Sequence, residues 1–172
     1  MKVARGPWTL IGAVLPGSLF AMLLVIAWRV DPRFSWVAHS WRAPWPIWGV
    51  AAGGLAGVIG SMSDYRYHRR WPVVGEPEHK SHLIALLSGG VPLFVVMAVA
   101  TLTSRPALLI VPMVALVSYI VFWVAYDELV FHRKRRCKKA ERVYHALSTV
   151  GNATALLSWA HWVFAMGVGN AR

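Results

Sequence analysis

Acidic residues and histidines recur at matched spacing in two short polar segments, SMSDYRYHRRWPVVGEPEHKSH and YDELVFHRKRRCKKAERVYH. In each segment an acid stands four residues before a His-Arg pair, and after a short loop a glutamate stands four residues before a second histidine. Carboxylate and imidazole groups without sulfur suit iron, manganese or zinc. We therefore predict eight metal ligands: Asp64, His68, Glu78, His82, Glu128, His132, Glu141 and His145.

The spacing within each acid–histidine pair has a geometric consequence. Residues four apart lie on one face of an α-helix, so each acid and its histidine can converge on one point. Eight ligands are more than one zinc ion needs, and two ions roughly 3.5–4 Å apart would use them. The predicted cofactor is a pair of metal ions, with iron favoured over manganese and zinc.

Further polar residues surround the repeated positions. Glu76, His79, Asp127 and Tyr144 are predicted to hydrogen-bond to the ligands or to form loop ion pairs. Asp127 would exchange roles with Glu128 if the helix were turned by one residue. Arg69, Arg70, Arg133 and Lys134 lie beside the ligands and are predicted to attract an anionic headgroup.

A simpler interpretation of the acids competes with metal binding. They could pair with the abundant arginines and lysines nearby and only fix the helix ends. Glu78 and Glu141 would also be favoured at helix N-termini by the helix dipole. Neither argument explains why a histidine follows each of these glutamates at the same interval.

Long apolar runs must position these polar segments. Hydrophobic residues make up 57% of the chain, and its charges gather in clusters between the runs. An apolar helix of about 20 residues crosses a hydrocarbon core roughly 30 Å thick. We predict an all-α membrane protein whose single domain, residues 1–172, has five spans at about 8–30, 46–68, 79–102, 106–132 and 141–166.

The two polar segments connect spans two to three and four to five. Each connection makes a helical hairpin, and both hairpins enter the same side of the membrane in the same direction. The sequence therefore predicts a parallel internal repeat about an axis along the membrane normal. Four helices would form a bundle with their ligand-bearing ends at one level, within one chain or across a homo-oligomer.

Basic residues set the orientation, because cytoplasmic loops hold an excess of lysine and arginine. A cytosolic N-terminus places 13 of the 18 basic residues inside, together with the polar segments, and leaves the C-terminus outside. The first apolar run is too long for a signal peptide. The predicted location is the inner membrane, and the net charge of +11 is explained by contact with lipid headgroups rather than with nucleic acid.

Two histidines are remote from the predicted metal site. His161 follows His145 by 16 residues, which is about 24 Å along a helix. With His39 it could bind haem or a quinone near the outer face, but the surrounding tryptophans favour an interfacial aromatic belt. That belt would contain Trp36, Trp41, Trp45 and Trp48.

Glycines recur in the predicted second span, at Gly53, Gly54, Gly57 and Gly60. Small residues allow the backbones of membrane helices to approach each other closely. We predict that these glycines serve helix packing and bind no phosphate.

The polar pattern resembles that of carboxylate-bridged dinuclear-metal proteins of the di-iron type, in which Glu and His on four helices hold two metals. The resemblance covers only the eight predicted ligands, with acid and histidine four residues apart in place of the three of Glu-x-x-His. The layout is also similar to that of membrane hydroxylases and desaturases, although the HxxHH-type boxes of that family are absent.

These resemblances imply a membrane-embedded, non-haem, di-iron oxidoreductase acting on a lipid-like or hydrophobic substrate at the cytosolic face. Two alternatives remain, a two-metal hydrolase or transferase acting on a phosphorylated headgroup and a metal-ion transporter or sensor. The sequence contains no HExxH, GxSxG, GxxxxGK[ST] or CxxC motif, which excludes the common peptidase, hydrolase, nucleotide-binding and thiol-redox classes.

Overall fold

We analysed a computed structural model, which describes residues 8–70, 76–132 and 138–168. Side chains are described for these ranges except at residues 8–11, 13, 76, 79 and 132. The described chain is helical, with no strand. The prediction of an all-α fold is confirmed.

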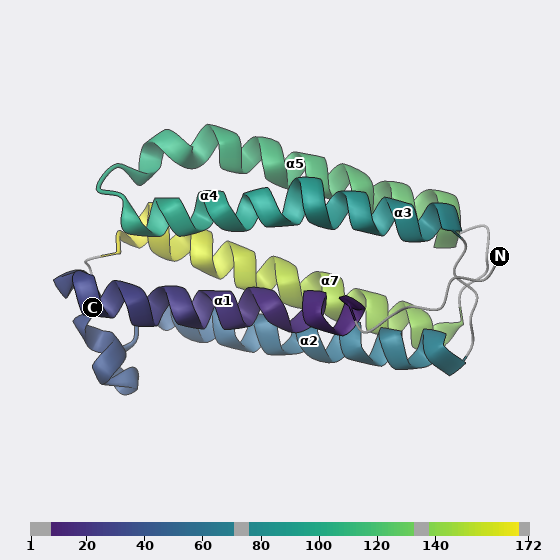
Figure 1. Cartoon of the computed structure of the whole chain (residues 1–172), viewed down its shortest axis with the longest axis horizontal. Coiled ribbons are helices and arrows are strands. Elements are labelled where there is room, and N and C mark those ends of the chain that lie inside the picture. Colours follow the sequence, from purple (N-terminus) through teal and green to yellow (C-terminus); the bar gives the residue numbers. More distant parts are fainter. Residues whose placement is uncertain (1–7, 71–75, 133–137, 169–172) are drawn as a thin grey trace.

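The helices lie along one long axis and are joined at its two ends (Figure 1). Helices η1, η2 and η4 are 3-10 helices, whereas η3, η5 and η6 are π-helices that continue α-helices. The chain order is α1 (Trp8–Val30), η1 (Pro32–Ala38), η2 (Ser40–Arg42), α2 (Trp45–Arg70), α3 (Glu76–Ile84), η3 (Ala85–Gly90), α4 (Val91–Leu102), η4 (Pro106–Leu109), α5 (Ile110–Tyr126), η5 (Asp127–His132), α7 (Lys139–Ala160) and η6 (His161–Met166).

Three helical stretches are long and apolar enough to cross a membrane: Trp45–Arg70, Lys80–Leu102 and Pro106–Phe131. A fourth span results if Val14–Val30 is counted together with Pro32–Ala38, from which it is bent by 119°. The described residues thus support three or four of the five predicted spans. The predicted span 141–166 is not among them, because α7 and η6 carry acidic, histidine and other polar residues along their length.

Helices α2 and α7 form the most extensive helix pair in the described chain, and glycine makes their close approach possible. A Cβ added at Gly53 would come within 2.6 Å of the backbone nitrogen of Ala155. One added at Gly60 would come within 2.8 Å of the Cα of Ser148. The predicted role in packing is confirmed at these positions, but not at Gly54, where a Cβ would meet open space.

One antiparallel register runs along the α2–α7 pair. It begins with Gly49 against Ser158, continues through Gly57 against Gly151 and reaches Gly60 against Ser148. The hydroxyls of Ser61 and Ser148 are 2.8 Å apart in a hydrogen bond at the same level. The next turns of this contact face carry Asp64 and His68 on α2 and His145 and Glu141 on α7.

The hydrophobic core lies toward the opposite end of the helices. Trp159 of α7 packs edge-on against Phe20 and Phe94, at ring-centroid distances of 4.7 and 5.4 Å. Its indole N–H donates a 2.9 Å hydrogen bond to the hydroxyl of Thr101, which donates in turn to the carbonyl of Met97. Thr101 and Met97 are fully buried, so α1, α4 and α7 meet in a closely packed interior.

Helix η1 turns sharply away from α1 and packs its aromatic side chains into this core. Phe34 and Trp36 are buried against Trp162 of η6, at ring-centroid distances of 6.0 and 5.9 Å. Trp36 therefore belongs to the core and not to the predicted aromatic belt. Trp41, Trp45 and Trp48 are exposed, as that belt requires.

An ion pair fixes the turn between α1 and η1. Arg33 donates to Asp31 from its guanidinium at 2.6 Å and from its backbone N–H at 2.9 Å. These hydrogen bonds from Arg33 hold the pKa of the Asp31 carboxyl below its usual range. Arg33 also donates to the carbonyl of Leu102, so the pair ties η1 to the end of α4.

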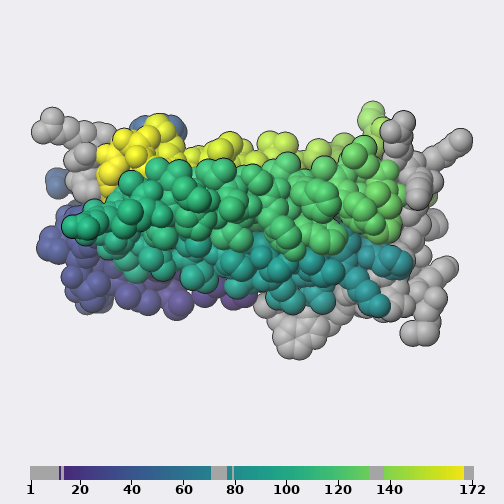
Figure 2. All heavy atoms as spheres, turned by 90° about the horizontal axis from the view of Figure 1, so that it is seen from above, coloured from purple at the N-terminus to yellow at the C-terminus, as the bar shows by residue number. Residues whose placement is uncertain are grey.

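Helix α5 lies at the outside of the bundle, where it packs on η3 and α4. The face seen in Figure 2 is largely made of its green side chains. Many of these side chains are large and apolar, including Val111, Val121 and Phe122. Such a surface suits contact with lipid.

Candidate metal centres

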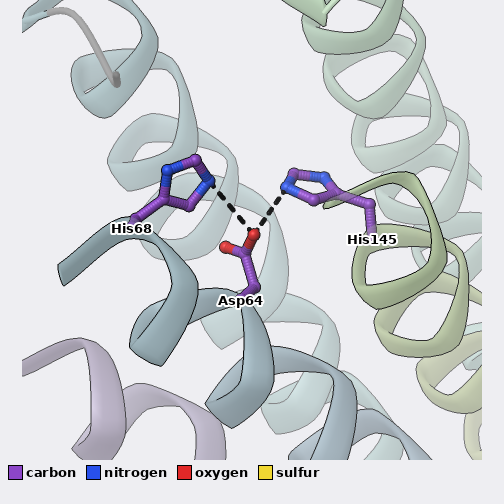
Figure 3. A group of neighbouring side chains, drawn as sticks. All are labelled: Asp64, His68 and His145. Carbon is purple, nitrogen blue, oxygen red and sulfur yellow. Dashed lines mark ion pairs between the residues drawn. The ribbon is translucent and has the colours of Figure 1, made fainter. Parts of the chain in front are cut away.

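The first candidate centre joins α2 and α7. The Oδ1 atom of Asp64 lies 3.2 Å from Nε2 of His68 and 3.1 Å from Nε2 of His145. Both imidazoles point toward this carboxylate (Figure 3). Glu141 adds a second acid, with its Oε1 3.3 Å from Nε2 of His68. We call these four residues the α2–α7 cluster.

The α2–α7 register explains how these four side chains meet. Asp64 and His68 are one helical turn apart on α2, as are Glu141 and His145 on α7. Because the glycine contacts bring the two backbones close together, short carboxylate and imidazole side chains reach across the interface. Glu141 also lies in the first turn of α7, where the helix dipole favours an acid.

The second candidate centre joins α3 and η5. Nε2 of His82 lies 2.9 Å from Oδ1 of Asp127. Glu78 of α3 completes a group whose ligand atoms lie within 4.8 Å of one another. The corresponding atoms of Asp64, His68 and His145 meet the same limit. We call Glu78, His82 and Asp127 the α3–η5 cluster.

The α3–η5 cluster contains Asp127 where the sequence favoured Glu128. Asp127 is buried and contacts His82, whereas Glu128 is exposed and lies outside the described cluster. The physical reason is the helix type, because Asp127 begins a π-helical turn. A π-helix bonds residue i to i+5, so the α-helical i+4 rule does not hold there.

Each cluster draws on both hairpins. The first hairpin supplies Asp64 and His68 to one cluster and Glu78 and His82 to the other. The second hairpin supplies Glu141 and His145 to the α2–α7 cluster and Asp127 to the α3–η5 cluster. Each cluster therefore pairs one helix of the first hairpin with one helix segment of the second.

The acids of both clusters are buried, at 8% exposure for Asp64, 3% for Glu78, 7% for Asp127 and 4% for Glu141. Buried carboxylates are costly unless a positive charge offsets their desolvation and mutual repulsion. The donor set of acids and imidazoles fits a hard or borderline metal cation.

Other residues that the sequence predicts at the site either reach a cluster through a chain of ring contacts or fall outside the described structure. Tyr144 is partly buried, and its ring lies 6.3 Å from that of Tyr67, which contacts the His68 ring at 5.3 Å. The side chains of Glu76, His79 and His132 lie outside the described part of the structure. Arg133 and Lys134 also lie outside the described residues.

No motif singles out Ser81, which is 5% exposed and precedes His82 in the chain. Its hydroxyl has no hydrogen-bond partner within the described residues. Ser81 follows Glu78 by three residues on α3, so the two share a helix face. Only its burial on α3 reveals it, and that burial depends on how the helices pack.

Comparison of the chain with models of protein families, with curated proteins and with solved structures gave no match. A proposal for the function therefore rests on the residues and geometry of the two clusters.

Proposed function

We propose that this chain is a multi-pass membrane protein that binds two metal ions, one in each cluster. One observation carries the proposal: buried acids and histidines from four helix segments bring their ligand atoms together in two compact groups. Cations would offset both the desolvation of these acids and their mutual repulsion. His132 remains a predicted ligand that metal analysis can test, and the proposal takes Asp127 in place of Glu128 as the acid from η5.

The membrane topology follows from the distribution of charge. Exposed basic residues gather at the cluster end of the helices, at Arg66, Arg69, Arg70, Lys80, Lys138, Lys139 and Arg142. By the positive-inside rule, we propose that this end lies at the cytosolic face. In this proposal α7 with η6 is a fifth span, whose polar residues face α2 and the α2–α7 cluster.

We further propose that the bound ions are iron and that the protein is an oxidoreductase acting on a lipid-like substrate. Hydroxylation of a C–H bond would consume dioxygen, two electrons and two protons, and would yield an alcohol and water. Bound iron supplies the redox chemistry that carboxylates and imidazoles lack. The electrons would come from a cytosolic reductant.

Substrate binding would use two parts of the surface. An acyl chain can lie along the apolar exterior of η3 and α5, and its binding energy would come from burial against these side chains. An anionic headgroup would be attracted by the exposed cations at the cluster end, such as Arg69 and Arg70.

Metal analysis of the full chain purified in detergent tests the proposal. We expect two iron ions per chain, and an iron content near one per chain in Asp64→Asn and in Asp127→Asn. Glu128→Gln is a matched control for Asp127→Asn, because it removes the neighbouring, exposed acid. It should retain both ions, because Asp127 supplies the carboxylate that contacts His82.

Other results would contradict distinct parts of this proposal. Absence of stoichiometric metal would reject the metal centres altogether. Two zinc ions in place of iron would reject the oxidoreductase and favour metal-assisted hydrolysis. Unchanged metal content in both aspartate variants would reject the clusters as ligand sets.

A further inference from the structure

The two clusters differ in how tightly the protein encloses them. The α2–α7 cluster lies on a helix interface where backbones touch at glycine, and a serine pair closes the interface one turn away. The side chains of His68 and His145 there are 2% and 23% exposed. The side chain of His82 in the α3–η5 cluster is 35% exposed.

The helices beside the two clusters also differ. Asp64, His68, Glu141 and His145 all lie in regular α-helix. In the α3–η5 cluster, Asp127 begins one π-helical turn, and another begins at Ala85, three residues after His82. Single π-helical turns inserted in α-helices frequently occur at functional sites.

The helix that supplies Glu78 and His82 also carries a buried hydroxyl group without a described partner. Ser81 is buried one turn from Glu78 on the same face of α3. A buried hydroxyl ordinarily finds a hydrogen-bond partner, and leaving it without one is costly. A ligand bound to an ion in this cluster would provide an acceptor.

The surface next to this cluster is apolar. Leu83, Ile84, Leu86 and Leu87 follow His82 and are each more than two-fifths exposed. Leu129 on η5 is 60% exposed. An acyl chain lying on these residues would pass close to the α3–η5 cluster.

We infer that the two centres have different roles: the α2–α7 cluster encloses an ion held only by protein, and the α3–η5 cluster holds the ion with an open coordination position. That position takes a small exogenous ligand, which accepts a hydrogen bond from Ser81. The reactive centre is therefore the one beside the exposed leucines. This inference rests on the proposed binding of two metal ions.

Cobalt(II) and azide test this division, because azide occupies open positions on a metal and changes the visible spectrum of cobalt. The full chain in lipid nanodiscs should bind two cobalt ions and one azide. Asp64→Asn should keep one cobalt and the azide response, whereas Asp127→Asn should keep one cobalt and lose the response. The retained cobalt also shows that each variant is folded.

Serine variants test the role of the hydroxyl. Ser81→Ala should keep both cobalt ions and weaken azide binding roughly fivefold, which corresponds to one hydrogen bond of about 1 kcal/mol. Ser88→Ala is the matched control, because Ser88 is exposed and already bonds to Tyr119. It should leave the azide affinity unchanged.

Failure of this inference can be told apart from failure of the proposed function. Absence of bound cobalt would reject both. Two bound cobalt ions that each take azide, or an azide response that survives in Asp127→Asn, would reject only the division of roles. Equal azide affinity in Ser81→Ala and in the unmodified chain would reject the hydrogen bond.

Discussion

The two ends of the helix bundle bury different kinds of side chain. At the end away from the clusters the interior is aromatic and aliphatic, with Trp162, Phe34 and Met97 almost fully enclosed. At the cluster end the buried side chains are acids, His68, Ser81 and Tyr65. One end is therefore held by packing and the other contains groups that favour a bound cation.

This difference matters more in a membrane than in water. Lipid is as apolar as leucine, so helices associate through close packing and hydrogen bonds rather than through the hydrophobic effect. Interlocked rings at Trp159 and Trp162 supply such packing without any ligand. The cluster end instead buries acids, whose desolvation a bound cation would offset, so we expect that end to depend on metal.

Removing the central ring of the packed end should have the largest effect on stability. Trp159→Ala deletes contacts with Phe20 and Phe94 and the hydrogen bond to Thr101. We expect a loss of about 3 kcal/mol in the free energy of unfolding, the low end for a buried tryptophan. Unfolding in denaturing detergent measures it, and metal content should remain at two ions per folded chain.

Trp159→Phe serves as the control for this substitution, since it keeps a six-membered aromatic ring and loses the pyrrole part of the indole with its N–H. The expected loss is smaller, about 1–2 kcal/mol, from the hydrogen bond and part of the ring contact. A parallel decrease of metal content in Trp159→Ala would show that packing at one end and metal binding at the other are coupled. It would contradict the independence of the two ends.

Metal removal should loosen the cluster end alone. A ligand present at a hundredfold excess over its dissociation constant stabilises the folded state by about 2.7 kcal/mol. Chelation should then accelerate amide hydrogen exchange by up to roughly 100-fold in residues 61–70 and 139–148. Residues 93–101 and 159–166 should exchange at an unchanged rate, as mass spectrometry can measure.

The double variant Asp64→Asn with Asp127→Asn controls for direct effects of the chelator. Adding chelator to it should change nothing, because its clusters have already lost their ions. Faster exchange over the whole chain would mean that metal stabilises the entire bundle and not one end.

Much of the fold could be predicted because its signals are local. The apolar runs gave the helices, and the small residues Gly53, Gly57 and Gly60 indicated a close interface. The partner of that interface could not be predicted. Nothing in the spacing of the hairpins shows that α2 packs on α7, since helix pairing is decided by contacts distant in sequence.

In the candidate sites, too, local features could be predicted from the sequence and the effects of packing could not. Residue type and spacing identified Asp64, His68 and His145, which lie in regular helix where the four-residue rule applies. The rule selected Glu128 over Asp127 because it assumes α-helical geometry, and the chain is π-helical there. Ser81 carries no motif, so only its burial reveals it.

The smallest expected effect concerns pH at the packed end. The hydrogen bonds from Arg33 lower the pKa of Asp31 in the folded state, so their stabilisation is present above the unfolded pKa of about 3.9. It should be lost as the pH falls through the lower, folded-state pKa. Hydrogen exchange of η1, corrected for the intrinsic pH dependence of exchange, should then accelerate slightly because Arg33 ties η1 to Leu102.

Asp31→Asn isolates this contribution from the titration of the acids in the clusters. Below about pH 4 the corrected exchange of η1 in the variant and in the unmodified chain should converge, while at neutral pH the variant should exchange faster. The difference should be small, because the Asp31–Arg33 pair is only partly buried and ion pairs that water reaches contribute little. A difference in exchange rate that grows as the pH falls would have the wrong sign for a carboxylate of lowered pKa. It would show that the Asp31–Arg33 ion pair does not stabilise the packed end.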